Sequence, residues 1–113
     1  MKDKSSNKKN VLVYGAGEAG RQLVISLKNN PEFKVIGFLD DNIQLHSQVL
    51  LDKIIHSPLN LKKIIISDDV SLVFLAIPSI GRNKRNQILN KLNEYKLIVK
   101  TLPSVSEIID GRV

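Results

Sequence analysis

Three glycines in the spacing Gly-x-Gly-x-x-Gly restrict the folds open to this chain more than any other feature. They directly follow Val11–Tyr14, a short apolar run that is typical of a strand. The next segment, Glu18–Asn29, has apolar residues at helical spacing. In this context Gly15 permits a tight turn, Gly17 lets a phosphate group approach the backbone, and Gly20 lets the helix pack closely on the strand. The pattern predicts a strand, a glycine turn and a helix.

A second strand extends this pattern. Asn29–Pro31 ends the predicted helix, because proline cannot extend a helix and asparagine tolerates the left-handed conformation of a helix end. Lys34–Leu39 is then a β-rich run that ends at the acidic pair Asp40 and Asp41. The sequence up to this point therefore predicts a βαβ unit.

The middle of the chain is less regular. The short apolar groups Val49–Leu51 and Ile54–Ile55 predict either a small edge strand or an irregular connection. Ser57 followed by Pro58 is typical of a helix start. A helix would follow, although Ile64–Ile66 could equally form a strand.

The last third alternates strands and helices. The predicted elements are a buried strand at Ser71–Ile77, a helix at Arg82–Tyr95, a strand at Leu97–Leu102 and, from a capping box, a short helix starting at Ser104–Glu107. This alternation predicts an α/β fold, a Rossmann-like doubly wound parallel sheet of about five strands. We assign residues 1–9 to a flexible basic tail and 10–113 to a single domain, because a chain of 113 residues fits one domain.

The composition excludes several classes of protein. The chain has no cysteine, which excludes disulfides, thiolate metal sites and a cysteine nucleophile. No apolar run approaches the ~20 residues of a membrane helix, and the polar N-terminus is not a secretory signal. The net charge of +6 arises partly from the tail, which holds four of the 17 basic residues, and only 4% of residues are aromatic. Nucleic acid is therefore not an expected partner.

Ligands of parallel sheets bind beyond the carboxyl ends of the strands, where the strand order reverses. Three sequence features fall at that edge: the glycine turn, the acidic pair, and the segment after the third long strand with its basic cluster. The candidate cofactor-binding residues are Gly15, Ala16, Gly17, Glu18, Ala19, Gly20, Arg21, Asp40, Asp41, Ile77, Pro78, Ser79, Arg82 and Arg85. The alternative is that the glycine turn serves packing and binds nothing.

The acidic pair and the helix start have candidate roles in binding a dinucleotide. A helix that begins at Glu18 offers free N–H groups and a positive dipole end to a pyrophosphate. Asp40 can accept both hydroxyls of an adenosine ribose, and an acid there favours NAD(H) over NADP(H) because it disfavours a 2′-phosphate. Two adjacent acids leave open which of Asp40 and Asp41 faces the ligand, and the pair could also form only a polar turn.

A basic cluster opens the Arg82–Tyr95 helix. Arg82, Lys84 and Arg85 lie in its first turn, where positive charge opposes the helix dipole. A phosphate or a sugar nucleotide would resolve that conflict, and a solvated basic helix end is the alternative. Arg21 could likewise reach a phosphate or a neighbouring domain. The sequence has no Ser-His-Asp, HExxH or Tyr-xxx-Lys arrangement, so we expect no catalytic and no metal-binding residues.

Four sequence blocks resemble a known family. They are Val11–Gln22 with Val35–Asp41, Ala76–Ser79 with the arginines after it, Thr101–Ser104, and Asp110–Val113. Together they resemble the nucleotide-binding domain of membrane-bound polysaccharide-biosynthesis proteins, the nucleoside-diphosphate-sugar 4,6-dehydratases and epimerases. The resemblance covers nearly the whole chain from Asn10 onward.

The resemblance implies a role within a larger enzyme. In that family, membrane helices precede this domain, and a catalytic short-chain-dehydrogenase domain follows it in the same chain. It implies a domain that binds NAD(H) or a sugar nucleotide for polysaccharide precursor synthesis, at the cytoplasmic face of the inner membrane, without catalysing the reaction itself. Contact with the membrane would come only through segments absent here, and assembly into a homo-oligomer is left open.

The sequence departs from the family at the third strand. Ser47 follows His46 where the family usually has glycine, and no glycine occurs from 38 to 80. We therefore expect an altered adenine side of the pocket. Three other functions remain open: the equivalent domain of a membrane-bound sugar-phosphate transferase, a docking or dimerisation module, and a metabolite sensor. A nucleotide-binding domain should keep an open cleft at the glycine turn, whereas a docking module should fill it.

Overall fold

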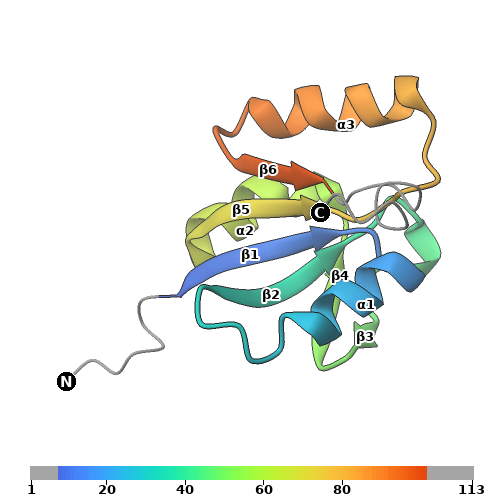
Figure 1. Cartoon of the computed structure of the whole chain (residues 1–113). Coiled ribbons are helices and arrows are strands. Elements are labelled where there is room, and N and C mark those ends of the chain that lie inside the picture. The colour runs from blue at the N-terminus through green and yellow to red at the C-terminus, as the bar shows by residue number, and fades with distance from the viewer. Residues whose placement is uncertain (1–7, 102–113) are drawn as a thin grey trace, which may run out of the picture.

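The computed structural model describes residues 8–101, and it begins with the predicted strand, glycine turn and helix. Strand β1 (Lys9–Tyr14) leads through the glycine turn into helix α1 (Glu18–Ser26), and β2 (Phe33–Leu39) follows. The later elements are the 3₁₀ helix η2 (Ile43–Leu45), β3 (Val49–Leu50), β4 (Lys53–His56), the 3₁₀ helix η3 (Pro58–Asn60), α2 (Leu61–Asp68), β5 (Val70–Leu75), α3 (Arg82–Asn93) and β6 (Ile98–Thr101). Figure 1 shows their arrangement.

The strands form one six-stranded sheet in the order β3-β4-β2-β1-β5-β6. β4, β2, β1, β5 and β6 are parallel, and β3 pairs antiparallel with β4 at one edge. The chain moves outward from β1 through β2 to β4 and then returns to β5 on the other side of β1. The strand order therefore reverses between β1 and β5. The predicted Rossmann-like α/β fold is confirmed, with five parallel strands and one short antiparallel strand.

Two apolar layers enclose the sheet, one on each face. Alternate residues of β1 point to opposite faces, so Val11 and Val13 pack with Val24 of α1. Leu12 and Tyr14 instead pack against α2 and α3. Figure 1 shows α1 and α2 on opposite sides of the sheet.

Several boundaries differ from the sequence predictions. Helix α1 ends at Ser26 rather than at Asn29, because Asn30 instead forms a turn in which its Oδ1 accepts N–H bonds from Glu32 and Phe33 at 2.7 and 3.0 Å. The ambiguous Ile64–Ile66 segment is helical. The capping box at Ser104–Glu107 lies outside the described residues.

The connection between β2 and β4 is the most irregular part of the fold. It contains η2 and β3 and no α-helix, and β4 is a parallel strand of the sheet rather than part of an irregular connection. Leu51 and Asp52 form the two-residue turn between β3 and β4, both in the left-handed conformation with φ of 53° and 65°. No helix within residues 8–101 is long and apolar enough to cross a membrane.

Candidate functional site

The glycine turn is held tightly to the strands on both sides. Gly15 has a φ of 117°, and its N–H donates to the carbonyl of Leu39 at 2.7 Å. A side chain here would clash, because a Cβ on Gly15 would lie 2.7 Å from the carbonyl oxygen of Ala76. The N–H of Ala76 in turn donates to the carbonyl of Tyr14 at 2.9 Å. These bonds continue the sheet pairing beyond β1.

The other two glycines of the motif differ in their surroundings. A Cβ on Gly20 would overlap the carbonyl oxygen of Gly15, so Gly20 allows α1 to lie against the turn. A Cβ on Gly17 would meet nothing within 4 Å. Gly17 precedes α1 without a side-chain cap, and free N–H groups of the helix start therefore face open space. This geometry suits the approach of an anion.

An open hollow of about 520 Å³ lies at this turn, and it brings most of the predicted residues together. The predicted residues that line it are Gly15, Gly17, Glu18, Ala19, Asp40, Asp41, Ile77, Pro78 and Ser79. Lys84 of α3 reaches the same hollow. No side chain of the described residues fills this space.

Asp40 braces the glycine turn. Its Oδ2 accepts the N–H of Ala16 at 2.8 Å, and its Oδ1 accepts the N–H of Asn42 at 2.8 Å. His46 Nε2 also forms a hydrogen bond of 2.6 Å with the backbone carbonyl of Asp40. The carboxylate that the sequence suggests for a ribose therefore already has two backbone partners.

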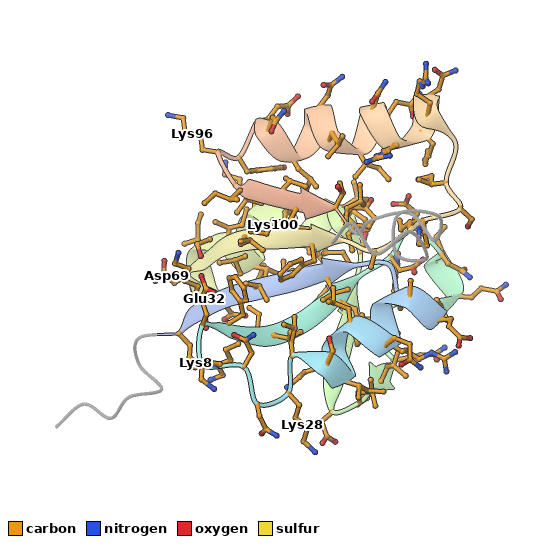
Figure 2. The ribbon with its side chains drawn as sticks, in the orientation of Figure 1. Lys8, Lys28, Glu32, Asp69, Lys96 and Lys100 are labelled. Carbon is orange, nitrogen blue, oxygen red and sulfur yellow. The ribbon has the colours of Figure 1, made fainter. Side chains whose placement is uncertain are left out.

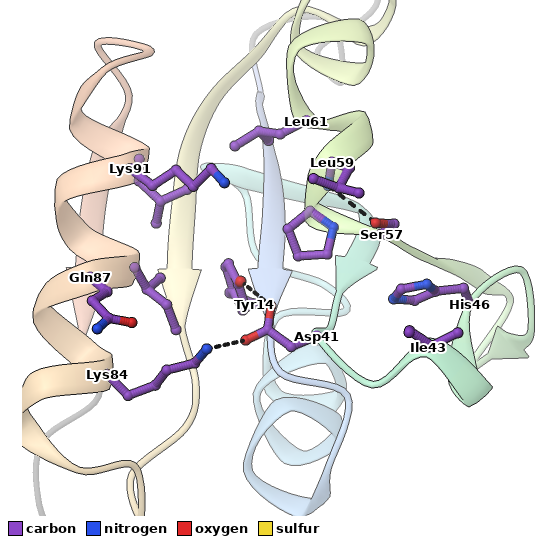
Figure 3. Close-up of a pocket in the computed structure, with 13 residues that line it drawn as sticks. Tyr14, Asp41, Ile43, His46, Ser57, Leu59, Leu61, Lys84, Gln87 and Lys91 are labelled. Carbon is purple, nitrogen blue, oxygen red and sulfur yellow. Dashed lines mark hydrogen bonds and ion pairs between the residues drawn. The ribbon is translucent and has the colours of Figure 1, made fainter.

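Asp41 lies next to a tyrosine and a lysine (Figure 3). The hydroxyl of Tyr14 donates to Asp41 Oδ1 at 2.6 Å, and Lys84 Nζ lies 3.8 Å from Oδ2. Burial raises the pKa of Tyr14, and the hydrogen bond to Asp41 raises it further. The phenol therefore stays protonated and fixes the orientation of the carboxylate.

A second hollow of about 350 Å³ continues from Asp41 toward α2 and α3. Asp41 and Lys84 line both hollows. Ser57, Leu59 and His46 lie on one side of it, and Lys84, Gln87 and Lys91 on the other (Figure 3). The two hollows therefore adjoin at Asp41 and Lys84.

The remaining predicted residues lie outside both hollows. Ala16 donates its N–H to Asp40, and Gly20 packs against the carbonyl group of Gly15. Arg21 Nη2 lies 4.0 Å from Glu18 on an exposed part of α1. Arg82 and Arg85 line a separate shallow hollow with Asn86. The structure therefore does not bring the predicted arginines to the glycine turn.

The sequence analysis missed several residues of the second hollow. Tyr14 ends β1, His46 follows η2 and Ser57 follows β4, but their side chains form no local motif. Lys84 belongs to the predicted basic cluster, and Gln87 and Lys91 recur with it on one face of α3, which is the periodic signal that could have found them. Within residues 8–101, no group of three or more His, Asp or Glu side chains could hold a metal ion.

The fold and the open glycine turn define a Rossmann-like domain. More specifically, the chain belongs to the PglD N-terminal domain family, which matches residues 10–99. The match is to this family, whereas the sequence blocks suggested 4,6-dehydratases and epimerases. A search of curated proteins gave no significant match.

Solved structures agree with this assignment. UDP-D-quinovosamine 4-dehydrogenase from Vibrio fischeri is similar, with 34% sequence identity, a TM-score of 0.86, and coverage of 94% of this chain and 87% of that chain. A Rex-family repressor, RSP, has the same fold with 14% identity, a TM-score of 0.75, and coverage of 94% of this chain and 57% of that one. RSP in complex with β-NADH gives 14% identity and a TM-score of 0.73, with coverage of 95% and 58%.

Proposed function

We propose that this domain binds a nucleoside diphosphate sugar across the two joined hollows. The observation that carries the proposal is that Asp41 and Lys84 line both of them. One elongated ligand can therefore place its diphosphate at the glycine turn and its nucleoside between α2 and α3. The similarity to a protein named for a UDP-linked sugar supports this class of ligand.

The glycine turn supplies the diphosphate end of the site. Gly17 leaves the backbone open to close approach, and the uncapped start of α1 offers N–H groups and the positive end of the helix dipole. Lys84 adds an ammonium group at the border with the second hollow. These groups attract an anion without any metal.

The second hollow supplies the nucleoside end. Asp41 presents a carboxylate held by Tyr14, and such a fixed acceptor suits ribose hydroxyls or the N–H groups of a base. Leu61 and Ile88 give the hollow an apolar wall. A flat base can pack against that wall while its polar edge meets Asp41.

In this proposal the domain supports a reaction that another domain carries out. The resemblance to dehydratases and epimerases of polysaccharide synthesis suggests that reaction and a position at the cytoplasmic face of a membrane. A catalytic short-chain-dehydrogenase domain in the same protein is the partner that the resemblance implies. Binding of the sugar nucleotide here would hold it near that domain.

NAD(H) is the second candidate ligand. The glycine motif and Asp40 form the usual elements of a dinucleotide site, and both lie in the first hollow. The same fold binds β-NADH in the RSP complex. Each carboxylate oxygen of Asp40 already accepts a backbone N–H, from Ala16 or Asn42, so a dinucleotide ribose would share these acceptors.

A calorimetric titration of the 113-residue chain with UDP and, separately, with NAD⁺ tests the proposal. We expect UDP to bind and Asp41→Asn to weaken it by about tenfold, the effect of losing about 1.4 kcal/mol. Lys84→Met should weaken the binding of UDP as well. Lys62→Met, on the exposed surface of α2, should leave it unchanged. If NAD⁺ binds and UDP does not, and if Asp40→Asn weakens the binding of NAD⁺, the dinucleotide alternative would replace the proposal. Binding of neither ligand would favour a docking module.

A further inference from the structure

Residues 8–101 cover only part of the sheet face that carries α1. In a doubly wound sheet, each crossover between parallel strands places a helix on one face. The crossover from β2 to β4 instead contains η2 and β3. Within the described part of the chain, α1 is therefore the one α-helix on this face (Figure 1).

A groove of about 310 Å³ remains beside α1, between its second half and the turn of the β3–β4 hairpin. Val24 and Val35 are buried at its base. Ile25 and Leu51 form its walls and are 53% and 42% exposed. Large aliphatic side chains on two elements thus face one concave surface that no described residue covers.

Lysines surround this groove. Lys8, Lys28, Lys34 and Lys53 line it, against the single acid Asp52. Within residues 8–101, none of these lysines forms an ion pair with an acidic side chain. Figure 2 shows Lys8 and Lys28 extending from the lower part of the domain. An apolar base with a positive rim is complementary to a ligand with the opposite pattern of charge.

The turn beside the groove is strained. Leu51 has a φ of 53°, a left-handed conformation that is unfavourable for a residue with a bulky side chain. Asparagine and glycine adopt such two-residue hairpin turns with less strain. Backbone strain of this kind is often found at ligand-binding and switch regions. Here it places an aliphatic side chain at the wall of the groove.

We propose that this groove is a docking site for an acidic amphipathic helix of a partner protein. The helix would lie where the missing crossover helix would pack, with its apolar face on Ile25 and Leu51. Glu and Asp side chains on its flanks would pair with Lys28, Lys34 and Lys53. A second copy of this chain fits poorly, because each copy has a net charge of +6. The groove is concave, which suits a helix better than a flat membrane surface.

An NMR titration of the ¹⁵N-labelled 113-residue chain tests this proposal. The probe is a synthetic peptide of about four helical turns with leucines on one face and glutamates elsewhere, and its twin has lysines in place of the glutamates. We expect the acidic peptide to shift the amide signals of α1, the start of β2 and the hairpin turn. The basic twin should leave these signals unchanged.

Matched variants distinguish binding in the groove from an effect of net charge and from nonspecific hydrophobic binding. The double substitution Lys28→Glu and Lys53→Glu should weaken the binding of the acidic peptide about tenfold or more. Lys62→Glu with Lys63→Glu, on α2, changes the net charge equally and should have little effect. Ile25→Ser should weaken binding, whereas Ile66→Ser, also at an exposed isoleucine, should not.

Four results would overturn the proposal. They are equal binding of the basic twin, equal weakening by both lysine pairs, signal changes at the strand ends instead of the groove, and no binding up to about 1 mM peptide. Vesicles of an anionic phospholipid provide the last comparison. If they bind through Lys28 and Lys53 while the peptide does not, the surface serves a membrane instead.

Discussion

Among the turns of this domain that hold residues in the left-handed backbone conformation, two use different residue types to do so. At the glycine turn the residue is Gly15, with a φ of 117°. At the hairpin turn between β3 and β4 the residues are Leu51 and Asp52, with φ of 53° and 65°. Glycine adopts this conformation readily, whereas leucine does so only with strain.

The difference follows from what each turn presents to its surroundings. The glycine turn presents backbone N–H groups beside Gly17, and any side chain there would stand between them and a ligand. The hairpin turn presents the side chain of Leu51 at the wall of a groove. A binding surface made of backbone N–H groups requires glycine. A binding surface made of a side chain can require a residue in a strained backbone conformation. Three pairs of substitutions test this contrast.

The largest effect is expected within the glycine turn itself. Gly20→Ala would push a Cβ into the carbonyl of Gly15, and we expect a loss of about 3 kcal/mol or more in the free energy of unfolding. Gly17→Ala should cost less than about 1 kcal/mol, because a Cβ meets nothing there. Urea denaturation of both variants measures this difference. Equal losses would show that Gly20 is not packed as described.

A smaller effect is expected from the acid at each turn. Asp40→Asn removes one of two acceptor oxygens, and leaving a backbone N–H without its charged partner should cost about 1.5–3 kcal/mol. Asp52→Asn is the matched change at the hairpin turn, where asparagine tolerates the left-handed conformation, and it should stay within about 0.5 kcal/mol. Thermal denaturation of the pair checks this order, and a reversed order would contradict it.

The smallest effect has the opposite sign. Leu51→Asn relieves the strain of the hairpin turn, so we expect it to stabilise the domain by about 0.5–1 kcal/mol relative to Leu51→Ala. Both variants lose the aliphatic wall of the groove, and both should bind the acidic peptide more weakly. Denaturation and the NMR titration measure the two properties separately. If Leu51→Asn is no more stable than Leu51→Ala, the turn is not strained.

The parts of the structure that could be predicted depend on neighbours in the sequence. The glycine turn, the helix after it and the acids at the end of β2 follow from local spacing. The Ser57 cap also follows from local chemistry, since its Oγ accepts the N–H of Leu59 at 3.1 Å. The long buried strand β5 is visible as a continuous apolar run. These features fix the fold class and the edge where the site lies.

The parts that could not be predicted depend on tertiary contacts. β4 is a short strand that pairs with β2 at only two positions, Ile55 and His56, so its sequence carries little signal. The different roles of Asp40 and Asp41 depend on Ala16 and Tyr14, which are distant in sequence. The side of α3 that faces the strand ends depends on helix rotation, and it selects Lys84 rather than the arginines.

The bonds that join the glycine turn to the sheet have a consequence for the kinetics and entropy of binding. Gly15 is bonded to β2, Ala76 to β1, and Ala16 to Asp40, so the turn is fixed before any ligand arrives. A phosphate that reaches it meets N–H groups already in position, and little conformational entropy is lost on binding. Association should therefore be limited by diffusion and orientation rather than by loop closure, and affinity should depend mainly on the rate of release.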